Sequence, residues 1–261
     1  MKLSITSDVH LEFGSGTIKN TDKADVLILS GDILVADAFY KKEVDFFRNC
    51  LEEFVHVVYI MGNHEHYQGE FNETSSKIRA ELSRHFPASF NKYLHFLDNE
   101  TVEIDGVKFI GGTCWSSMND GDPLTMLNIK DQMNDFRIIK KGQRHFTPSD
   151  ATKEHEKFIS LVFQELSDDI LNVVVGHHPP SKQFIHPRYK DSYHMNGGYV
   201  SNLDAFIEDH PEIALWTCGH VHTPKTVMIG ETQVVCNPRG YYGLEHNDME
   251  IPLTTVEIKS K

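Results

Sequence analysis

Short apolar runs rich in β-branched residues alternate with amphipathic segments along the chain. Such runs are typical of buried strands, and they predict strands at residues 2–8, 26–30, 56–60, 172–176 and 213–219. Apolar residues at helical spacing predict helices at residues 37–54, 71–86 and 147–166. Pro87 ends the second helix, and Thr-Pro-Ser-Asp at 147–150 is typical of a helix start. Asp105-Gly106 predicts the turn of a hairpin within residues 101–112.

The remaining segments complete the predicted organisation. Residues 225–240 and 253–260 predict terminal strands of a sheet, whereas residues 116–146 show no regular pattern. Residues 178–198 predict a long polar loop. No internal repeat, low-complexity tract or linker divides the chain, so we expect one α/β domain over residues 1–261.

Composition and charge narrow the function classes. Apolar residues make up 39% of the 261 residues, but no run of 18 of them occurs, and the first residues lack a signal peptide. Four scattered cysteines disfavour disulfides and a zinc–thiolate site, which suggests a reducing, cytoplasmic setting. The formal net charge of −13 argues against a broad basic face for nucleic acid. A small phosphate-containing substrate remains compatible, because a metal pair makes its own site positive.

Candidate chemistry collects where the five predicted strands end. These ends carry Asp8-Val9-His10, Gly31-Asp32, Gly62-Asn63-His64-Glu65, Gly176-His177-His178 and Gly219-His220-Val221-His222. In an open α/β sheet, ligand sites lie beyond the carboxyl ends of the strands. Residues two apart in extended backbone point the same way, so both members of Asp-x-His or His-x-His can face one site. Imidazole, carboxylate and amide oxygen suit divalent first-row metals. Cys218 is expected in the core and not in this site.

The order D-x-H, G-D, G-N-H-[ED], G-H and G-H-x-H resembles the signature of the calcineurin-like metallophosphoesterase family. The resemblance extends from Asp8 to His222. It implies a two-sheet β-sandwich flanked by helices, with two divalent metal ions at the strand ends. Manganese is the favoured ion, and iron, nickel and zinc are alternatives. Carried over by motif, one ion is held by Asp8, His10 and His222, the other by Asn63, His177 and His220, and Asp32 bridges them.

The resemblance also implies a reaction. A hydroxide bridging the two ions would attack the phosphorus of a small phosphate ester, and His64 would protonate the leaving oxygen. Glu65 is expected either to orient His64 or to pack against a neighbouring helix N-terminus, and we favour a role in supporting the site from behind the ligands. Val35 stands where purple acid phosphatases carry a tyrosine ligand, and "GDILVAD" lacks the arginine of serine/threonine protein phosphatases. The pattern is closer to small bacterial and phage-type phosphodiesterases, including those acting on cyclic-nucleotide-like substrates.

Several neighbouring residues have less defined roles. His178 is expected to point away from the ligands and to anchor its loop. Solvated loop positions are expected for His66, His186 and His194. The segment 193–199 is either a lip beside the substrate or a plain turn. Arginines 137 and 144 are candidate phosphate contacts, although surface charge is the commoner role. Asn237 and Arg239 are expected to return near the metals without a catalytic role.

Other functions compete with phosphodiester hydrolysis. A phosphomonoesterase of the same fold is one alternative, and a scaffold that kept the fold without catalysis is another. Related scaffolds typically lack ligands or the histidine of G-N-H, whereas here His64 and every ligand position are filled. The H-x-H-x-D-H class of metallohydrolase is disfavoured because His66 is not followed by Asp-His. The sequence leaves the oligomeric state open.

Overall fold

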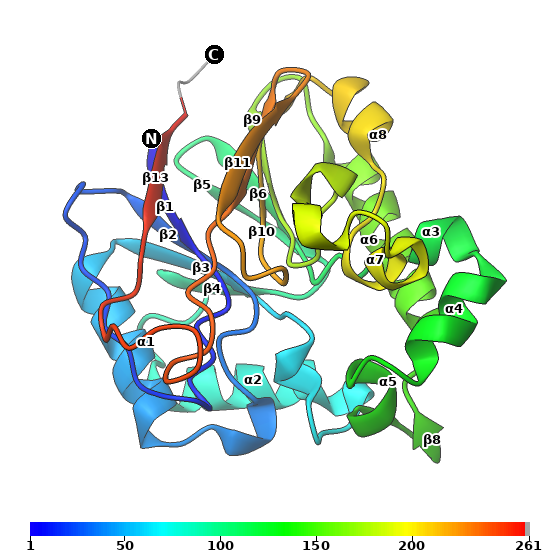
Figure 1. The fold of residues 1–261 in the computed structure, drawn as a ribbon. Coiled ribbons are helices and arrows are strands. Elements are labelled where there is room, and N and C mark those ends of the chain that lie inside the picture. The colour runs from blue at the N-terminus through cyan, green and yellow to red at the C-terminus, as the bar shows by residue number, and fades with distance from the viewer. Residues whose placement is uncertain (259–261) are drawn as a thin grey trace.

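Two sheets packed face to face form the centre of the molecule (Figure 1). The computed structural model describes residues 1–258. The first sheet has the order β13-β1-β2-β3-β4, in which β1 to β4 are parallel and β13 runs antiparallel to β1. Its strands are β1 (Lys2–Thr6), β2 (Val26–Ser30), β3 (His56–Ile60), β4 (Leu94–Leu97) and β13 (Thr254–Glu257).

The second sheet has the order β11-β12-β10-β9-β6-β5. Its four central strands are parallel, and the two edge strands run antiparallel to their neighbours. The strands are β5 (Glu100–Ile104), β6 (Val107–Gly111), β9 (Leu171–Val175), β10 (Ile213–Cys218), β11 (Lys225–Ile229) and β12 (Thr232–Cys236). A separate small hairpin pairs β7 (Lys140–Lys141) with β8 (Arg144–His145).

Strands buried on both faces explain why the apolar runs are continuous. In β2, Val26 and Ile28 belong to the core between the sheets, whereas Leu27 and Leu29 pack under the helices on the outer face. Such two-sided burial is typical of parallel strands covered by helices. The result is four layers, with helix, sheet, sheet and helix in succession.

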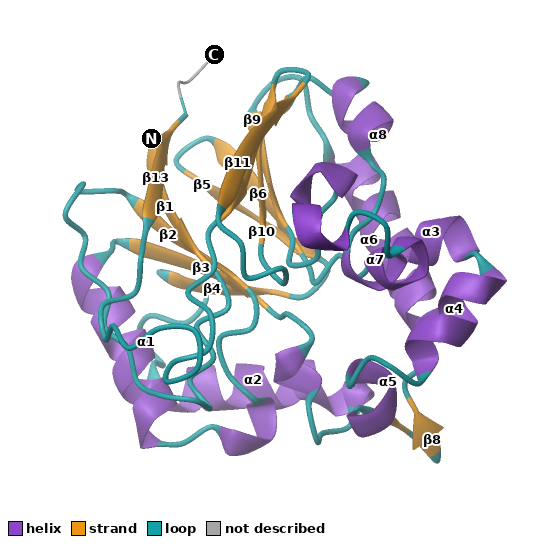
Figure 2. Cartoon of the chain, in the orientation of Figure 1, coloured by secondary structure: helices purple, strands orange, loops and turns teal. Residues whose placement is uncertain are grey.

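Helices cover both outer faces of the sandwich (Figure 2). The first sheet is covered by α1 (Lys41–Glu53) and α2 (Phe71–His85), and the second by α6 (Pro148–Glu165) and α8 (Asp204–Glu208). Within residues 1–258, no helix combines the length and the apolar character needed to cross a membrane.

The structure confirms the expected α/β sandwich, the five motif-bearing strands and the hairpin at Asp105-Gly106. Strand β4 was not predicted. The predicted helix at 37–54 is shorter: α1 begins at Lys41, where the Glu43 carboxylate accepts from the backbone N–H of Tyr40 at 2.8 Å, and Ala36–Ala38 form a separate 3₁₀ turn. Residues 253–260 form a strand only over β13, and Lys259 and Ser260 lie outside the described residues.

Two segments expected to be irregular contain helices. Residues 116–146 form α3 (Met118–Gly121), α4 (Pro123–Lys130) and α5 (Asp135–Ile138). The side chain of Asp122 accepts hydrogen bonds from the backbone N–H groups of Leu124 and Thr125, which starts α4 at Pro123. The predicted loop 178–198 contains two 3₁₀ turns and most of α7 (Tyr193–Tyr199), which pairs with α4.

Candidate metal centre

The seven predicted ligands come together at the carboxyl ends of five parallel strands. Strands β1, β2 and β3 of one sheet and β9 and β10 of the other deliver them to one edge of the sandwich. Their donor atoms form groups that could hold a metal ion. The seven are Asp8, His10, Asp32, Asn63, His177, His220 and His222.

The backbone is left-handed at most of these positions. The φ angles are 50° at Asp8, 48° at His10, 54° at Asp32, 69° at His220 and 45° at His222. A non-glycine residue in this region costs on the order of 1–2 kcal/mol, so the conformation persists only where the surrounding structure enforces it. Strain of this kind concentrates at functional sites, and here it turns each side chain toward the others.

Two glycines allow the carboxylates to approach the backbone. A Cβ atom at Gly62 would collide with Oδ1 of Asp32, and one at Gly219 would collide with Oδ2 of Asp8. The backbone N–H of His64 donates to Asp32 Oδ1 at 2.8 Å, and that of His220 donates to Asp8 Oδ1 at 2.9 Å. Gly62 and Gly219 therefore leave room for the carboxylates of Asp32 and Asp8, and the backbone N–H groups of His64 and His220 fix the orientation of those carboxylates.

The first donor group consists of Asp8, His10 and His222. The Nε2 atoms of His10 and His222 are 3.1 Å apart, and His222 Nε2 lies 3.4 Å from Asp8 Oδ1. Ligands with bonds of about 2.0–2.2 Å to one ion are separated by roughly 3.0–3.4 Å. These two spacings therefore fit donors facing one metal ion.

The second donor group consists of Asn63, His177 and His220. Asn63 Oδ1 lies 3.1 Å from His177 Nε2 and 3.0 Å from His220 Nδ1. Asp32 Oδ2 lies 3.3 Å from His177 Nε2 and 3.8 Å from His10 Nε2, so this one oxygen faces both groups. That is the position expected of a bridging carboxylate.

The expectation that His178 points away from the ligands is wrong. One of its ring nitrogens lies within 4.8 Å of ligand nitrogens of His177 and His220. Its ring packs on that of His220 at a centroid distance of 4.0 Å, and its other face meets Trp115. Its backbone N–H donates to Thr113 O, which supports the expected anchoring of the loop.

The electrostatics of the cluster favour added positive charge. Burial lowers the pKa of His177, but the carboxylates of Asp32 and Asp8 outweigh it and raise that pKa to about 10. Burial likewise opposes charge on His222, yet Asp8 and Glu245 raise its pKa to about 9. Two buried carboxylates thus attract protons to the imidazoles, and a bound cation would satisfy them instead.

His64 lies beside the predicted ligands, and one of its ring nitrogens lies within 4.8 Å of donor atoms of His10 and Asp32. Its Nδ1 is 2.9 Å from Oε1 of Glu12, and its ring stacks on Tyr67 at 4.0 Å. Burial lowers its pKa, but Asp32 and Glu12 more than compensate, so the pKa of His64 is raised. A histidine whose charged form is favoured by neighbouring carboxylates is a candidate general acid.

Glu12 is a site residue that the motif analysis missed. The same oxygen that faces His64 accepts from Nδ1 of His10 at 3.0 Å. With both Nδ1 positions engaged, Nε2 of each imidazole is free to face the centre. The alternation that joins Asp8 and His10 continues to Glu12, so this signal was present in the sequence.

The donor set fits two divalent ions. Nε2 of His220 is buried without a hydrogen-bond partner, and each donor group offers nitrogen together with carboxylate or amide oxygen. The family comparison agrees, because the model of the calcineurin-like phosphoesterase family matches residues 1–224. The chain belongs to the calcineurin-like phosphoesterase family. Members of this family usually bind two divalent metal ions.

Similar proteins share this phosphoesterase fold. "Uncharacterized protein L509" of Acanthamoeba polyphaga mimivirus is 25% identical, and the match covers 92% of this chain and 91% of that protein. The phosphopantetheinyl hydrolase of Mycobacterium tuberculosis superimposes with a TM-score of 0.64 at 14% identity, covering 92% of this chain and 89% of that one. The protein TT1561 of Thermus thermophilus gives 0.54 at 16% identity, covering 92% and 88%.

Glu65 supports the phosphoesterase site, but not by orienting His64. Its carboxylate accepts from the backbone N–H groups of Asp32, Ile33 and Gly62 at 2.7–3.0 Å and from the hydroxyl of Tyr59. It therefore fixes the loop that carries the bridging aspartate. Glu12 takes the role of orienting His64.

The other histidines divide into two kinds. His66 was expected to be solvated, yet it is 3% exposed and stacks on Phe71 at 4.5 Å, so that expectation is wrong. His186 is exposed, as expected. His194 is partly exposed and lies in α7, within 3.0 Å of the hydroxyl of Thr125.

The arginines contact protein groups. Arg137 is exposed, and Arg144 pairs with Asp150 at the start of α6. Arg239 is buried and donates to backbone carbonyls, including that of Val9 at 3.1 Å. Asn237 donates to backbone carbonyls on β1 and before β13. The last two residues hold the loop of Asp8 in place, which agrees with a non-catalytic role.

Two cavities are lined in part by the donor residues and share Tyr199, His220, His222 and Tyr241. We call the first the acidic cavity. It has a volume of about 590 Å³, and its wall includes Glu12, Asp32, His64, Tyr67, Asp135 and Met133. We call the second the α7 cavity, of about 680 Å³, with Phe184, Arg188, Tyr189 and Met195 in its wall.

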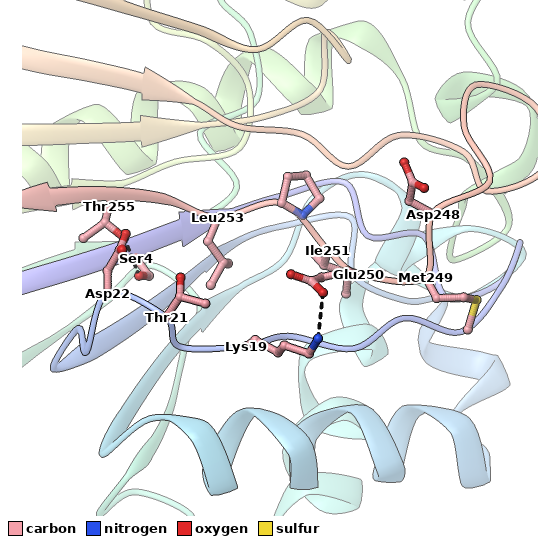
Figure 3. Close-up of a pocket in the computed structure, with 11 residues that line it drawn as sticks. Ser4, Lys19, Thr21, Asp22, Asp248, Met249, Glu250, Ile251, Leu253 and Thr255 are labelled. Carbon is pink, nitrogen blue, oxygen red and sulfur yellow. Dashed lines mark hydrogen bonds and ion pairs between the residues drawn. The ribbon is translucent and has the colours of Figure 1, made fainter.

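A third hollow lies away from the centre, between β13 and the N-terminal segment (Figure 3). It has a volume of about 550 Å³. Its wall carries the ion pair of Lys19 and Glu250, which the figure shows reaching across the opening. None of the predicted ligands lines it.

Proposed function

We propose that the chain is a phosphoester hydrolase that uses two divalent metal ions and favours phosphodiesters. The observation that carries the proposal is the convergence of seven donors on two groups, with one oxygen of Asp32 facing both. Ions held there would supply charge stabilisation to the phosphoryl oxygens and an activated water. The substrate is a small phosphate ester. Manganese is the favoured ion, which the three oxygen donors suit, and iron, nickel and zinc are the alternatives that the four imidazoles suit.

The side chains around the ions have separate tasks. His64, oriented by Glu12, is placed to hold a proton at the edge of the acidic cavity and to deliver it to a leaving alkoxide. Tyr67 and Tyr241 pack against the imidazoles and limit access of bulk water to them. All four cysteines are buried and unpaired, which supports the proposed cytoplasmic setting.

The preference for diesters rests on the two cavities. A diester has a group on each side of its phosphorus, and two cavities that share His220 and His222 adjoin the donor groups. Among the described residues, no lysine or arginine lines the acidic cavity, and Arg188 is the one such residue in the wall of the α7 cavity. A monoester dianion would gain little from these walls, whereas a diester carries one charge and two ester groups to bury.

The test is a substrate panel with defined metal loading. Metal-free protein is reconstituted with Mn, Fe, Ni, Zn or Mg and assayed on bis(4-nitrophenyl) phosphate and 4-nitrophenyl phosphate. We expect metal-dependent hydrolysis and a higher kcat/KM for the diester. A higher kcat/KM for the monoester would overturn the diester preference. Absence of hydrolysis with every metal would overturn the enzymatic assignment.

A further inference from the structure

Asp135 is a buried carboxylate that the proposed reaction does not use. It is 2% exposed, and its Oδ1 atom is buried without a hydrogen-bond partner. It is the first residue of α5 and lines the acidic cavity together with His64 and Tyr67. Burying a carboxylate oxygen without a partner is costly, so a group that arrives with the substrate is the economical partner.

The placement of Asp135 separates it from the metal ligands. None of the donor groups formed by the described residues includes it. Its nearest link to the centre is the Asn63 side chain, whose amide also donates to the hydroxyl of Tyr67 at 3.2 Å. Asp135 therefore lies outside the donor groups and is linked to them through Asn63, in the wall of the same cavity.

The rest of the cavity wall is suited to a cation. Three tyrosine rings surround the histidines, with Tyr67 at 4.0 Å from His64, Tyr241 at 4.5 Å from His222 and Tyr199 at 5.1 Å from His220. The faces of such rings attract ammonium groups. Asp32 faces the metal groups and Glu12 pairs with His10 and His64, so Asp135 is the carboxylate of the wall left for an ammonium. No lysine or arginine lies among the described residues that line the cavity.

We propose that the acidic cavity binds an ester group that ends in a primary ammonium, with Asp135 accepting a hydrogen bond from it. This inference rests on the proposed phosphodiesterase function and names the class of substrate. The ammonium lies against the tyrosine rings, and the phosphate of the same molecule reaches the metal ions. Asp135 is then a specificity residue for the ester group.

Symmetrical diesters test this inference, because they place the same group in the cavity in either orientation. The rate of alcohol release from bis(2-aminoethyl) phosphate is compared with that from dipropyl phosphate, which has the same shape without the charge. A charge-assisted hydrogen bond predicts a kcat/KM ratio of roughly 10 to 100 in favour of the amine. Bis(2-hydroxyethyl) phosphate, a neutral donor, is expected to fall near dipropyl phosphate.

Two variants assign the effect to Asp135. Asp135→Asn should reduce the ratio to about 1, and Asp131→Asn, an exposed aspartate on the same segment, should leave the ratio unchanged. Melting temperatures of both variants are recorded. If Asp135→Asn does not fold, inhibition of the wild type by 2-aminoethylphosphonate and by propylphosphonate, which have no leaving alcohol, is compared instead; tighter binding of the amine is expected, and equal binding would overturn the inference. A wild-type ratio near 1, equal rates for the amine and the hydroxyl ester, or a full ratio in Asp135→Asn would overturn the inference. If dipropyl phosphate and the amine ester are hydrolysed at equal rates, the proposed phosphodiesterase function stands and the ammonium inference fails. If no ester is hydrolysed, both the proposed function and the inference fail.

Discussion

The acidic cavity and the hollow beside β13 have similar volumes, about 590 and 550 Å³, but very different walls. The acidic cavity is lined by residues with left-handed backbone, such as Asp32, and by buried atoms without partners, such as Oδ1 of Asp135. In the hollow, Lys19 and Glu250 form an exposed pair, and none of the described lining residues has left-handed backbone or an unpaired buried atom.

This difference identifies what marks a functional site in this molecule. Volume does not distinguish the two openings, whereas strain and unsatisfied polar atoms do. Both are costly and persist where binding or catalysis requires them. Substitutions at the candidate metal centre should therefore change metal binding and catalysis. Substitutions in the hollow beside β13 should leave metal binding and catalysis unaltered.

The largest effect is expected from Asp32→Ala. Because one oxygen of Asp32 faces both donor groups, its loss should release both ions or leave one weakly bound. Metal catalysis supplies several kcal/mol, so activity should fall by about 1000-fold or more. Metal analysis of purified protein gives the direct measurement. Asp37→Ala, at an exposed aspartate nearby in the sequence, is the control, and two tightly bound ions in Asp32→Ala would contradict a bridging role.

His64→Ala should lower activity without loss of metal. The expected loss is about 10²–10⁴-fold on esters with poor leaving groups and much less on nitrophenyl esters, which hardly need a proton. His66→Ala is the matched comparison, because His66 is packed on Phe71 and should lower the melting temperature with similar losses on all esters. Equal losses for His64→Ala on all esters, together with a lowered melting temperature, would make it a packing residue.

Glu12→Gln should have a smaller effect, and it should affect both metal binding and proton donation by His64. Because Glu12 accepts from His10 and His64, we expect a loss of about 10–100-fold in metal affinity or activity. Activity should fall further as the leaving group becomes poorer. Glu245→Gln removes the negative charge beside His222 Nδ1 and is expected to weaken metal binding without that dependence. The same leaving-group dependence in both variants would argue against Glu12 acting through His64.

The smallest effect is expected in the hollow. Lys19→Ala and Glu250→Ala remove an exposed ion pair whose side chains are 62% and 57% accessible to solvent. Solvent screens such pairs, so melting temperature, metal content and kcat/KM should match those of the wild type within error. A loss of activity in either variant would show that the hollow contributes to function and would break the comparison.

The ends of the five motif-bearing strands could be predicted from the sequence, because a buried apolar run is followed each time by a polar motif built from glycine, aspartate, asparagine or histidine. Strand β4 escaped prediction because its four residues carry no motif. Helix α4 had a visible start at Asp122-Pro123, but its apolar residues show little helical periodicity. Among the site residues, the alternating pattern could have found Glu12. The burial of His66 could not be found, because the rings that enclose it come from other segments.

The first predicted ligand is held by the other end of the chain. The backbone N–H of Ser7 donates to Asn237 O, that of Gly240 donates to Asp8 O, and β13 pairs with β1. At about 5–20 residues per second, synthesis takes on the order of 10–50 s to pass from Asp8 to Gly240. During that interval the nascent chain already exposes His10 and Asp8 without their final geometry. We therefore expect metal loading to follow synthesis of the C-terminal segment, and ions captured earlier would bind to a chain that has not yet acquired its selectivity.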